Sequence, residues 1–361
     1  MRETLEQLDL ISRNERRVAM ATLVAVKGTT PRKEGAKMWV GAGGRILGSV
    51  TIGGCVDARV VAESEGVLRS GTPRLLSIAM SDQDAWDLGL TCGGVVDVLL
   101  EPVELRDDDD ELVRAYQVIR EETRAGRHAA MVTTLDAAAT RHMVVLADGG
   151  TAGTLGDAPL DDAARQAARE WLGRGASRTV TIEAAGASRD VFVEVHAPAA
   201  TLLVFGAGHV AIPLVAMAKT LGWHTVVMDG RERYATRERF PEADEIRIGA
   251  LGEMAETLSY DASTVVVLVA HDYKFELPVL RTVLRRSPAY IGLLGGRRRA
   301  RALLDFLATE GFDADALARV HVPVGLDIGA QTAAEIAVAI LAEAIAVRAG
   351  RSGASLQRSN T

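Results

Sequence analysis

Two cysteines, Cys55 and Cys92, have the clearest capacity for chemistry in this 361-residue chain. Each lies beside a pair of glycines, in the stretches TIGGCVD and LTCGGVVD. Bare glycine backbone leaves N–H groups beside the thiol, and such donors or a nearby arginine stabilise a thiolate. A free cysteine is otherwise most often a small buried hydrophobe. The glycine neighbours favour a thiol site that binds a ligand or carries a persulfide. Its residues would be Cys55, Cys92, Gly53, Gly54, Gly93 and Gly94.

A glycine turn in the second half of the chain, LLVFGAGHVAIP, has the pattern of a nucleotide-binding fold. Gly206 and Gly208 stand where an apolar strand gives way to a helix, so a pyrophosphate could approach the backbone closely. Asp229 follows at 229 − 208 = 21 residues, the usual position of a carboxylate that binds a ribose 2′-OH. Arg231 either pairs with Asp229 or admits a 2′-phosphate, and His209 lies inside the turn. The pattern predicts a Rossmann-like fold and leaves open whether NAD(P), a pterin or nothing binds there.

Polar side chains follow three other apolar runs of this half. His271 and Asp272 follow STVVVLVA, Arg297 begins the RRR run after YIGLLGG, and Asp327 follows RVHVPVGL. Taken alone, His271 and Asp272 fit a helix cap, and the arginines fit a solvated helix face. Together, however, they predict a ligand site at the carboxyl edge of a sheet, with His271 and Arg297 among its residues. His209 and His271 resemble a metal pair, but no third ligand has suitable spacing.

The first 196 residues alternate between strand-like and helical segments, and they do so twice. The first series comprises a helix over 5–17, strands over 18–28, 37–41 and 45–49, a helix over 56–71, and strands in PRLLSIAM and over 95–103. After the acidic run RDDDD, which suits a helix N-terminus, the segments HAAMVTTLD, HMVVLADGGTAGTLG, DDAARQAAREWLGRG, SRTVTIEAA and DVFVEVHAP repeat the order. The second series has no cysteine and a shorter glycine loop. We therefore predict an internal duplication in which the first copy carries the functional additions.

The remaining residues alternate strand and helix. TLLVFGAG, HTVVMDG, DEIRIGA, STVVVLVA, AYIGLLGG and RVHVPVGL are nearly continuous apolar runs, typical of parallel strands covered on both faces. The predicted fold is α/β. An N-terminal α+β domain with an internal duplication covers 1–196, and a C-terminal Rossmann-like doubly wound parallel sheet covers 197–361. The apolar segment 332–350 predicts a long helix, covered either by this sheet or by a second copy in a homodimer.

The composition and charge of the chain disfavour several functional classes. A net charge of -7 disfavours broad nucleic-acid binding. The polar N-terminus lacks the apolar centre of a signal peptide, and no apolar run has membrane-spanning length. The chain has no C-x-x-C pair, the spacing that would indicate a zinc finger. We expect a cytoplasmic protein with reduced thiols and without nucleic-acid or membrane partners.

A series of motifs along the chain resembles the XdhC/CoxI family, the xanthine dehydrogenase accessory factors. The motifs are GTTPRKEGAKMWV, GSVTIGGCVD, TCGGVVDVLLEP, LLVFGAGHVA, AHDYKFELPVL, YIGLLGGRRR and VPVGLDIGAQTAAEIAVAILAEAIAVR. Three positions depart from the family pattern: Asp57 follows Val56 where the family has Leu and Glu, Gly296 replaces a serine, and Ala333 replaces a proline. These mild changes are consistent with service to another hydroxylase, such as a carbon monoxide dehydrogenase.

The resemblance implies a maturation factor for molybdenum hydroxylases. Such a factor binds molybdenum cofactor, keeps it while a cysteine desulfurase supplies the sulfido ligand, and delivers it to the apo molybdenum hydroxylase. Cys55 and Cys92 match the family's cysteines and would face the metal, since a soft thiolate suits molybdenum. Arg32, Lys33 and the glycine turns would hold the phosphate end of the cofactor.

Two other functions use the glycine turn without the cysteines. One is an NAD(P)-dependent oxidoreductase, and the other is a regulatory nucleotide-binding protein without chemistry. Against the oxidoreductase, His271 and Asp272 are the only candidates for proton transfer, and adjacent residues on an extended chain point apart. The cysteine motifs therefore favour a cofactor-binding chaperone without a catalytic residue of its own.

Overall fold

The structure, a computed structural model, describes residues 2–28, 32–41, 43–51, 54–80, 94–107, 110–136, 139–270 and 272–355. The chain divides into two units, Met1–Pro198 and Ala199–Thr361, each with its own hydrophobic cores. This division falls two residues after the boundary that the sequence predicts between residues 196 and 197. Within the described ranges, no helix is both long enough and apolar enough to cross a membrane.

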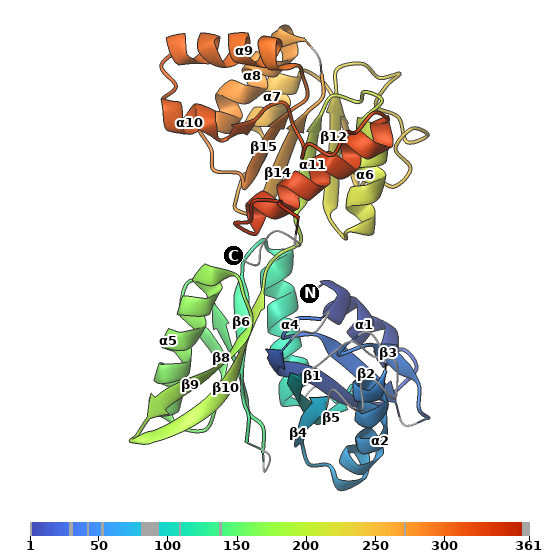
Figure 1. Cartoon of the computed structure of the whole chain (residues 1–361), viewed down its shortest axis with the longest axis vertical. Helices are drawn as coiled ribbons and strands as arrows, with labels where there is room; N and C mark the ends of the chain where they lie inside the picture. Colours follow the sequence, from blue (N-terminus) through green and yellow to red (C-terminus); the bar gives the residue numbers. More distant parts are fainter. Residues whose placement is uncertain are drawn as a thin grey trace. The chain divides into compact units, whose positions relative to one another are not determined.

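The first unit contains two copies of one arrangement (Figure 1). The first copy comprises α1 (Arg2–Ser12), β1 (Arg17–Gly28), β2 (Lys37–Gly41), β3 (Ile46–Gly48), α2 (Cys55–Ser70), β4 (Arg74–Met80) and β5 (Gly94–Glu104). The second comprises α4 (Glu111–Arg124), β6 (Ala129–Thr134), β7 (His142–Leu146), β8 (Thr151–Gly153), α5 (Ala158–Arg174), β9 (Arg178–Ala184) and β10 (Ala187–His196). The strand orders, β3-β2-β1-β5-β4 and β8-β7-β6-β10-β9, correspond strand for strand. The predicted internal duplication is confirmed.

The helix that opens the chain is shorter than the predicted range 5–17. It ends at Ser12 because the amides of Asn14 and Glu15 both donate to the carbonyl oxygen of Ile11, at 3.1 and 2.8 Å, and close the last turn. The strand β1 then begins at Arg17. Before the second copy, the predicted helix start after the acidic run is confirmed. The carboxylate of Asp110 accepts the amides of Leu112 and Val113 and caps α4.

Each sheet of the first unit packs one face against the helix of its own copy. Alternate residues of β1, β2 and β5 form a core with α2, and the corresponding residues of the second sheet form a core with α5. The opposite faces share a core with α1 and α4, in which Met20, Trp39, Tyr116 and Met131 are buried. The alternation of strand side chains thus separates a helix-covered face from a face shared by both copies.

The first sheet gathers its connections at one end, which we call the loop edge. Because neighbouring strands are antiparallel, β1, β3 and β4 end there, and β2 and β5 begin there. The connections at this edge are 29–36, 49–54 and 81–93, of which the structure describes 32–36, 49–51 and 54. The predicted cysteine, glycine and arginine motifs all belong to these connections or border them.

The second unit is a six-stranded parallel sheet between helices (Figure 1). Its elements are β11 (Thr201–Phe205), α6 (Ala211–Thr220), β12 (His224–Asp229), β13 (Glu245–Ile248), α7 (Leu251–Glu256), β14 (Thr264–Leu268), α8 (Tyr273–Leu284), β15 (Tyr290–Leu293), α9 (Arg297–Thr309), α10 (Ala314–Ala318), β16 (Val320–His321) and α11 (Ala333–Arg348). The strand order is β13-β12-β11-β14-β15-β16. All six predicted strands are present, and the order reverses between β11 and β14, as in a Rossmann fold.

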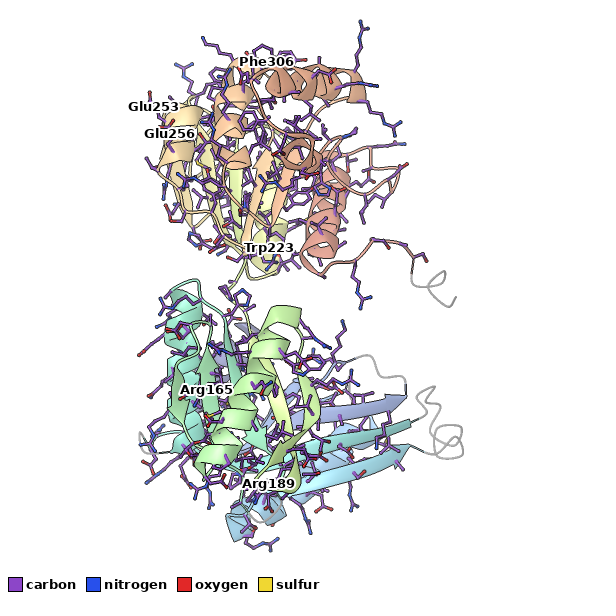
Figure 2. All side chains as sticks on the ribbon, turned by 90° about the vertical axis from the view of Figure 1, so that its left-hand side faces the viewer. Arg165, Arg189, Trp223, Glu253, Glu256 and Phe306 are labelled. Carbon is purple, nitrogen blue, oxygen red and sulfur yellow. The ribbon has the colours of Figure 1, made fainter. Side chains whose placement is uncertain are left out.

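Both faces of this sheet are covered. Leu202 and Val204 of β11 face the core that contains α6 and α11, whereas Leu203 and Phe205 face α7, α8 and α9. The predicted apolar helix over 332–350 is α11, and its apolar side packs within the same unit. At its end the guanidinium of Arg348 lies over the ring of Trp223, which Figure 2 labels. The sheet therefore covers one side of this helix, while Val338 and Ile345 on it are exposed, and a homodimer stays a prediction.

Candidate functional site

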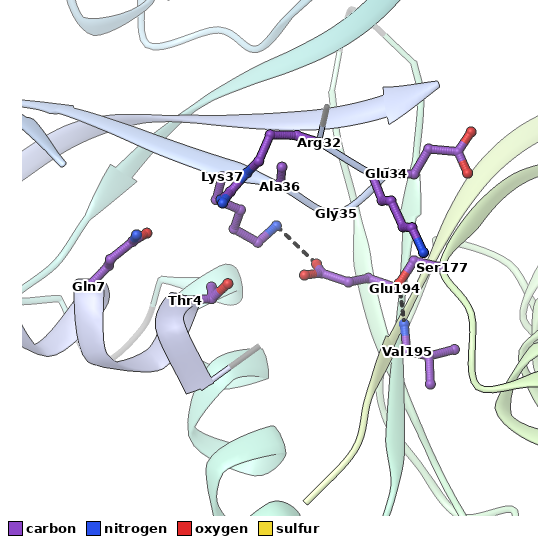
Figure 3. A pocket seen from close by; sticks show the side chains of 11 residues that line it. Thr4, Gln7, Arg32, Glu34, Gly35, Ala36, Lys37, Ser177, Glu194 and Val195 are labelled. Atoms are coloured by element: carbon purple, nitrogen blue, oxygen red, sulfur yellow. Dashed lines mark hydrogen bonds and ion pairs between the residues drawn. The ribbon is translucent and has the colours of Figure 1, made fainter. Parts of the chain in front are cut away.

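A pocket of about 390 Å³ lies in the first unit, where the loop edge meets the second copy (Figure 3). Arg32, Lys33 and Lys37 line it from the first copy, and α1 contributes two polar residues, Thr4 and Gln7. Ser177 and Glu194 line it from the second copy. The predicted binding residue Arg32 thus lies in a pocket whose three cations outnumber its two carboxylates, Glu34 and Glu194, which leaves an excess of positive charge for an anionic group.

The inner end of the pocket is a buried ion pair. The Lys37 ammonium lies 2.9 Å from the Glu194 carboxylate and donates to the Thr22 hydroxyl at 3.0 Å. The side chains of Lys37 and Glu194 are only 1% and 4% exposed. Burial alone would raise the pKa of Glu194, but the nearby charges of Lys37 and His196 outweigh it and lower the pKa to about 2. Glu194 is therefore ionised at neutral pH.

The second copy has a matching buried pair. His142 occupies the position of Lys37, since Thr22 faces Lys37 between β1 and β2 as Thr133 faces His142 between β6 and β7. Its Nε2 lies 3.1 Å from the carboxylate of Glu101, and its Nδ1 lies 3.1 Å from the Thr133 hydroxyl. Burial opposes both charges, but their mutual attraction prevails: the pKa of His142 is raised and that of Glu101 is lowered. Each copy thus supplies a cation to the other copy's carboxylate.

Cys55 is the first residue of α2, and the connection before this helix positions it. Gly54 precedes it with φ 92° and ψ −154°, a conformation that favours glycine, and no side chain of the described residues caps the helix. Asp57 anchors the connection: its carboxylate accepts the amide and hydroxyl of Thr51, at 3.2 and 3.1 Å, and the hydroxyl of Ser49. The half-buried thiol is free and lies beside uncapped amides.

The thiol and the pocket lie on different faces of the first sheet. Cys55 belongs to the α2 core, with Met38 of β2, whereas the neighbouring Lys37 points to the shared face. Ala36 connects the two regions, because it packs against the α2 core and also lines the pocket. The loop 32–36 therefore crosses the edge of the sheet between Cys55 and the basic pocket.

Several predicted binding residues cannot be placed. Cys92, Gly53, Gly93 and His271 lie outside the described residues. Gly94 begins β5 with φ 143°, and a Cβ there would lie 2.3 Å from the carbonyl oxygen of Lys27. Close approach of β1 and β5 thus accounts for this glycine, and its predicted contact with a cofactor stays a prediction.

The glycine turn of the second unit brings its predicted residues together. Gly206 has φ 108°, and a Cβ there would lie 2.9 Å from the amide nitrogen of Ala270, so the turn requires glycine. Gly208 and the exposed His209 follow it before α6. Asp229 lies at the end of β12, and its side chain contacts groups of the protein itself. Its carboxylate accepts the Ala207 amide at 2.7 Å and pairs with Arg231.

Of the predicted polar residues at the carboxyl edge of this sheet, some stabilise the protein itself and others are exposed. Asp272 caps α8 by accepting the amide of Lys274 at 2.9 Å. Arg297 and Arg298 are exposed in the first turn of α9, and they line an open cavity of about 610 Å³ together with Tyr273. Arg297 is thus accessible to a ligand. In the described part of the chain, no group of three His, Cys, Asp or Glu side chains could hold a metal ion.

Sequence reasoning missed the buried pairs. The signal was present, because Glu194 in VFVEVH, Glu101 in VVDVLLEPV and His142 in HMVVL interrupt strands that are otherwise apolar. A charged residue on a buried strand position needs a partner. The sequence of one strand cannot identify that partner, since in both pairs it comes from the other copy.

Comparison with protein families gives two matches along the chain. A model described as the XdhC and CoxI family matches residues 11–79 and 123–183, and a model described as the XdhC Rossmann domain matches residues 202–344. The first match takes a segment from each copy of the duplicated unit, and the second covers the parallel sheet. The three matched segments together span most of the chain.

Known proteins resemble the chain over nearly its whole length. A protein of Bacillus subtilis (strain 168), named as a probable xanthine dehydrogenase subunit, is 28% identical over 343 residues, which cover 94% of this chain and 96% of that protein. The "Molybdenum cofactor insertion chaperone PaoD" of Escherichia coli (strain K12) is 26% identical over 330 residues, which cover 91% and 83%. A crystal structure described as a xanthine dehydrogenase from Bacillus halodurans matches with a TM-score of 0.77 and 27% identity, and covers 98% of both chains.

Proposed function

Because the chain belongs to the XdhC and CoxI family, we propose that it is a chaperone that binds molybdenum cofactor and inserts it into a molybdenum hydroxylase of the xanthine dehydrogenase type. The relative named as a molybdenum cofactor insertion chaperone supports the cargo. The relative named as a probable component of xanthine dehydrogenase supports the class of hydroxylase.

One observation carries the assignment of the site: the two copies share a fold, yet the thiol and the basic pocket both border the loop edge of the first copy. Cys55 begins a helix that Gly54 leaves uncapped, and Arg32 and Lys33 lie across the edge. At the corresponding position of the second copy, Asp157 caps α5 by accepting the amide of Leu160. The proposed cargo site is the loop edge.

The residues at this edge fit the chemistry of the cargo. Molybdenum cofactor combines a soft-ligand metal centre with an anionic phosphate end. A thiolate is a suitable ligand for the metal end, and Cys55 is the first residue of α2, whose N-terminus no side chain of the described residues caps. Arg32 and Lys33 supply charge for the phosphate end, and Lys37, held by Glu194, keeps the inner end of the pocket polar. Cys92 is the second proposed thiol ligand.

Sulfuration of the cargo and its delivery define the proposed partners. A cysteine desulfurase would add the terminal sulfido ligand while the cargo is bound, and the apo-hydroxylase would then receive it. Asp57 and Gly296, where the chain departs from the family pattern, are compatible with a hydroxylase of the carbon monoxide dehydrogenase type as the recipient. We place these steps in the cytoplasm.

The test is retention of the cargo by the purified full-length protein. The wild type, Cys55→Ser, Cys92→Ser and the double variant are prepared from cells that make molybdenum cofactor. Bound molybdenum is measured by mass spectrometry and the pterin by fluorescence after oxidation. We expect both signals to fall together in the variants, most in the double variant. Equal retention by the double variant and the wild type would exclude the thiols as ligands, and absence of the cargo from the wild type would exclude the proposed function.

A further inference from the structure

The end of β12 presents a cation where a Rossmann fold that binds NAD presents a carboxylate. The Asp229 side chain is only 5% exposed, and both of its oxygens have donors. One accepts the amide of Ala207 at 2.7 Å, and the other accepts the amide of Arg231 at 2.9 Å. Burial raises the pKa of Asp229, but the hydrogen bonds from Arg231 and Ala207 outweigh it and hold the pKa below its ordinary value. Asp229 is thus an ionised, saturated acceptor inside the turn.

Arg231 covers this carboxylate from the solvent side. Its Nε and Nη2 donate to the two oxygens of Asp229 at 2.9 and 2.8 Å, while its side chain remains 54% exposed. A ligand that approaches the end of β12 therefore meets a guanidinium before it meets the carboxylate. A ribose 2′-OH would need the hydrogen-bonding capacity of Asp229, which Arg231 already uses, whereas a 2′-phosphate would bind the exposed cation.

The surroundings hold Arg231 in place. The Arg231 guanidinium lies 3.9 Å from the ring centroid of Tyr234. Arg239 donates to the carbonyl oxygens of Ala207 and Tyr234 at 3.0 and 2.6 Å, and so ties the segment after β12 to the glycine turn. The two arginines share the Tyr234 ring, because Arg239 lies 5.1 Å from its centroid. This is a preorganised cationic surface and not a freely moving side chain.

The glycine turn beside this surface offers donors for a pyrophosphate. Gly206 and Ala207 use their amides within the protein, on Met228 and Asp229. In the part of the chain that the structure describes, the amides of Gly208 and His209 have no acceptor, and His209 is exposed. Two free amides next to an arginine-covered strand end match a pyrophosphate followed by a phosphorylated ribose.

We propose that the second unit binds a dinucleotide that carries a 2′-phosphate, of the NADP(H) class, and discriminates against NAD(H) through Arg231. The Gly208 and His209 amides hold the pyrophosphate, and Arg231 holds the 2′-phosphate. This site is separate from the cargo site at the loop edge and does not depend on it. No hydride transfer is part of the proposal. Nucleotide binding here would give the chaperone a response to the NADP(H) pool.

The first experiment is calorimetric titration of the full-length wild type with NADPH, NADH, adenosine 2′-monophosphate and adenosine 5′-monophosphate. Hydrogen bonds to charged groups imply that NADPH binds about tenfold to hundredfold more tightly than NADH. The 2′-monophosphate should compete with NADPH more strongly than the 5′-monophosphate, because only the former has the phosphate that Arg231 would bind. Equal affinities for NADPH and NADH, or no binding of NADPH at a concentration of about 1 mM, would overturn the proposal.

Variants then test the residue. Arg231→Ala should remove the preference for NADPH, and NADH should bind no more weakly than before because Asp229 becomes available to a ribose. Arg301→Ala, at another exposed arginine of the same unit, is the matched control and should bind both nucleotides like the wild type. Thermal unfolding without nucleotide checks the fold, and Arg231→Gln, which has no charge, replaces Arg231→Ala if the latter is unfolded. A folded Arg231 variant that retains the full NADPH preference would refute the assignment.

The cargo site provides a further check of independence. Cys55→Ser should bind NADPH like the wild type, even where it loses molybdenum cofactor. If the wild type carries the cargo but shows no selectivity for the 2′-phosphate, this inference fails and the proposed function stands. If NADPH binds selectively to protein that never carries the cargo, the inference stands and the proposed function fails.

Discussion

The two copies of the first unit have the same strands in the same order, but their connections differ. The copies carry α2 and α5 at corresponding places, and Gly48 and Gly153 have matching left-handed φ angles of 75° and 81° before these helices. At the loop edge, however, β4 and β5 are joined by residues 81–93, whereas β9 and β10 are joined by Ala185 and Gly186 alone. Because the sheets match and the connections differ, we expect the connections to carry the function and the sheets to position them.

The helix starts show the same contrast. Asp157 closes the N-terminus of α5 with its own carboxylate. Gly54 leaves the N-terminus of α2 without a side-chain cap, and the residue that follows is Cys55, where the second copy has Pro159. The connections before both helices are nevertheless anchored alike, by Asp57 and Asp161. Among the described residues, a side chain caps the N-terminus of α5 and none caps that of α2.

The buried pairs differ in the cation and not in the geometry. Lys37 and His142 occupy equivalent strand positions, and each lies about 3 Å from a carboxylate of the other copy, at 2.9 and 3.1 Å. A lysine keeps its charge across the physiological pH range, whereas a histidine loses it within reach of that range. The same architecture therefore gives the two pairs different pH dependence.

The largest expected effect is that of breaking the lysine pair. Lys37→Met leaves the Glu194 carboxylate buried without its cation, and we expect a loss of about 3–5 kcal/mol in the free energy of unfolding. Urea denaturation followed by circular dichroism measures it. The double variant Lys37→Met/Glu194→Leu removes both charges and should recover most of the loss. No recovery would mean that shape, and not charge, sets the cost.

The histidine pair should cost less and should depend on pH. The pKa of His142 is raised in the folded protein, so its stabilisation is complete below its ordinary pKa of 6.5 and is lost as pH rises through the folded value. For Glu194 the pKa is lowered from 4.5 to about 2, so that stabilisation is complete above pH 4.5 and is lost as pH falls towards 2.

His142→Gln tests this difference, since glutamine hydrogen-bonds but does not titrate. Unfolding free energies of the variant and the wild type are compared between about pH 5 and pH 9, the range in which histidine titrates. The difference between them should shrink as pH rises through the folded-state pKa of His142. A difference that does not change with pH would show that the pKa of His142 is the same in the folded and unfolded protein, which contradicts a stabilising ion pair.

Exchanging the residues that begin the two helices tests the functional contrast. Cys55→Ser should reduce bound molybdenum cofactor about tenfold, which corresponds to roughly 1.4 kcal/mol of binding free energy. Pro159→Cys places a thiol at the matching position of α5, two residues before the anchor Asp161, but there the carboxylate of Asp157 already caps the helix. We expect no additional molybdenum in this variant. Bound molybdenum at twice the wild-type level would contradict the distinction between the copies.

The smallest effect concerns the cap itself. Asp157→Ala removes the acceptor for the Leu160 amide and should lower the free energy of unfolding by about 1 kcal/mol. The matched change at α2, Gly54→Ala, removes no cap, so any loss there reflects the strain of a left-handed φ. Urea denaturation of both variants measures the two losses. Asp157→Asn, which keeps a side chain that can cap the helix, is the conservative control.

Much of the fold was predictable because its signals are local. Apolar runs such as TLLVFGAG and the glycines that end them predict all six parallel strands and their order of appearance. The duplication was predictable because element order survives where residue identity does not. The end of the first helix was not, since the two amides that close it on Ile11 follow no distinctive sequence pattern.

The site was predictable only in part. The position of Arg32 in a glycine-rich loop indicated a binding residue, and the structure places it in a pocket. The sequence does not determine whether Arg231 pairs with Asp229, because spacing does not fix the rotamer of Arg231. Lys37 and Glu194 lie more than a hundred residues apart, so their pairing follows from the packing of the two copies and from no local pattern.

The crossed pairs make the two repeats chemically dependent on each other. Each repeat holds a carboxylate in its interior and relies on the other to neutralise it, through Lys37 for Glu194 and His142 for Glu101. Gene duplication would ordinarily yield two modules able to separate, recombine or be lost one at a time. Either repeat by itself would leave its carboxylate without the partner cation and its shared apolar face uncovered, so neither repeat is complete without the other. The second repeat is therefore retained as an obligatory half of the domain, although its own connections carry none of the binding motifs.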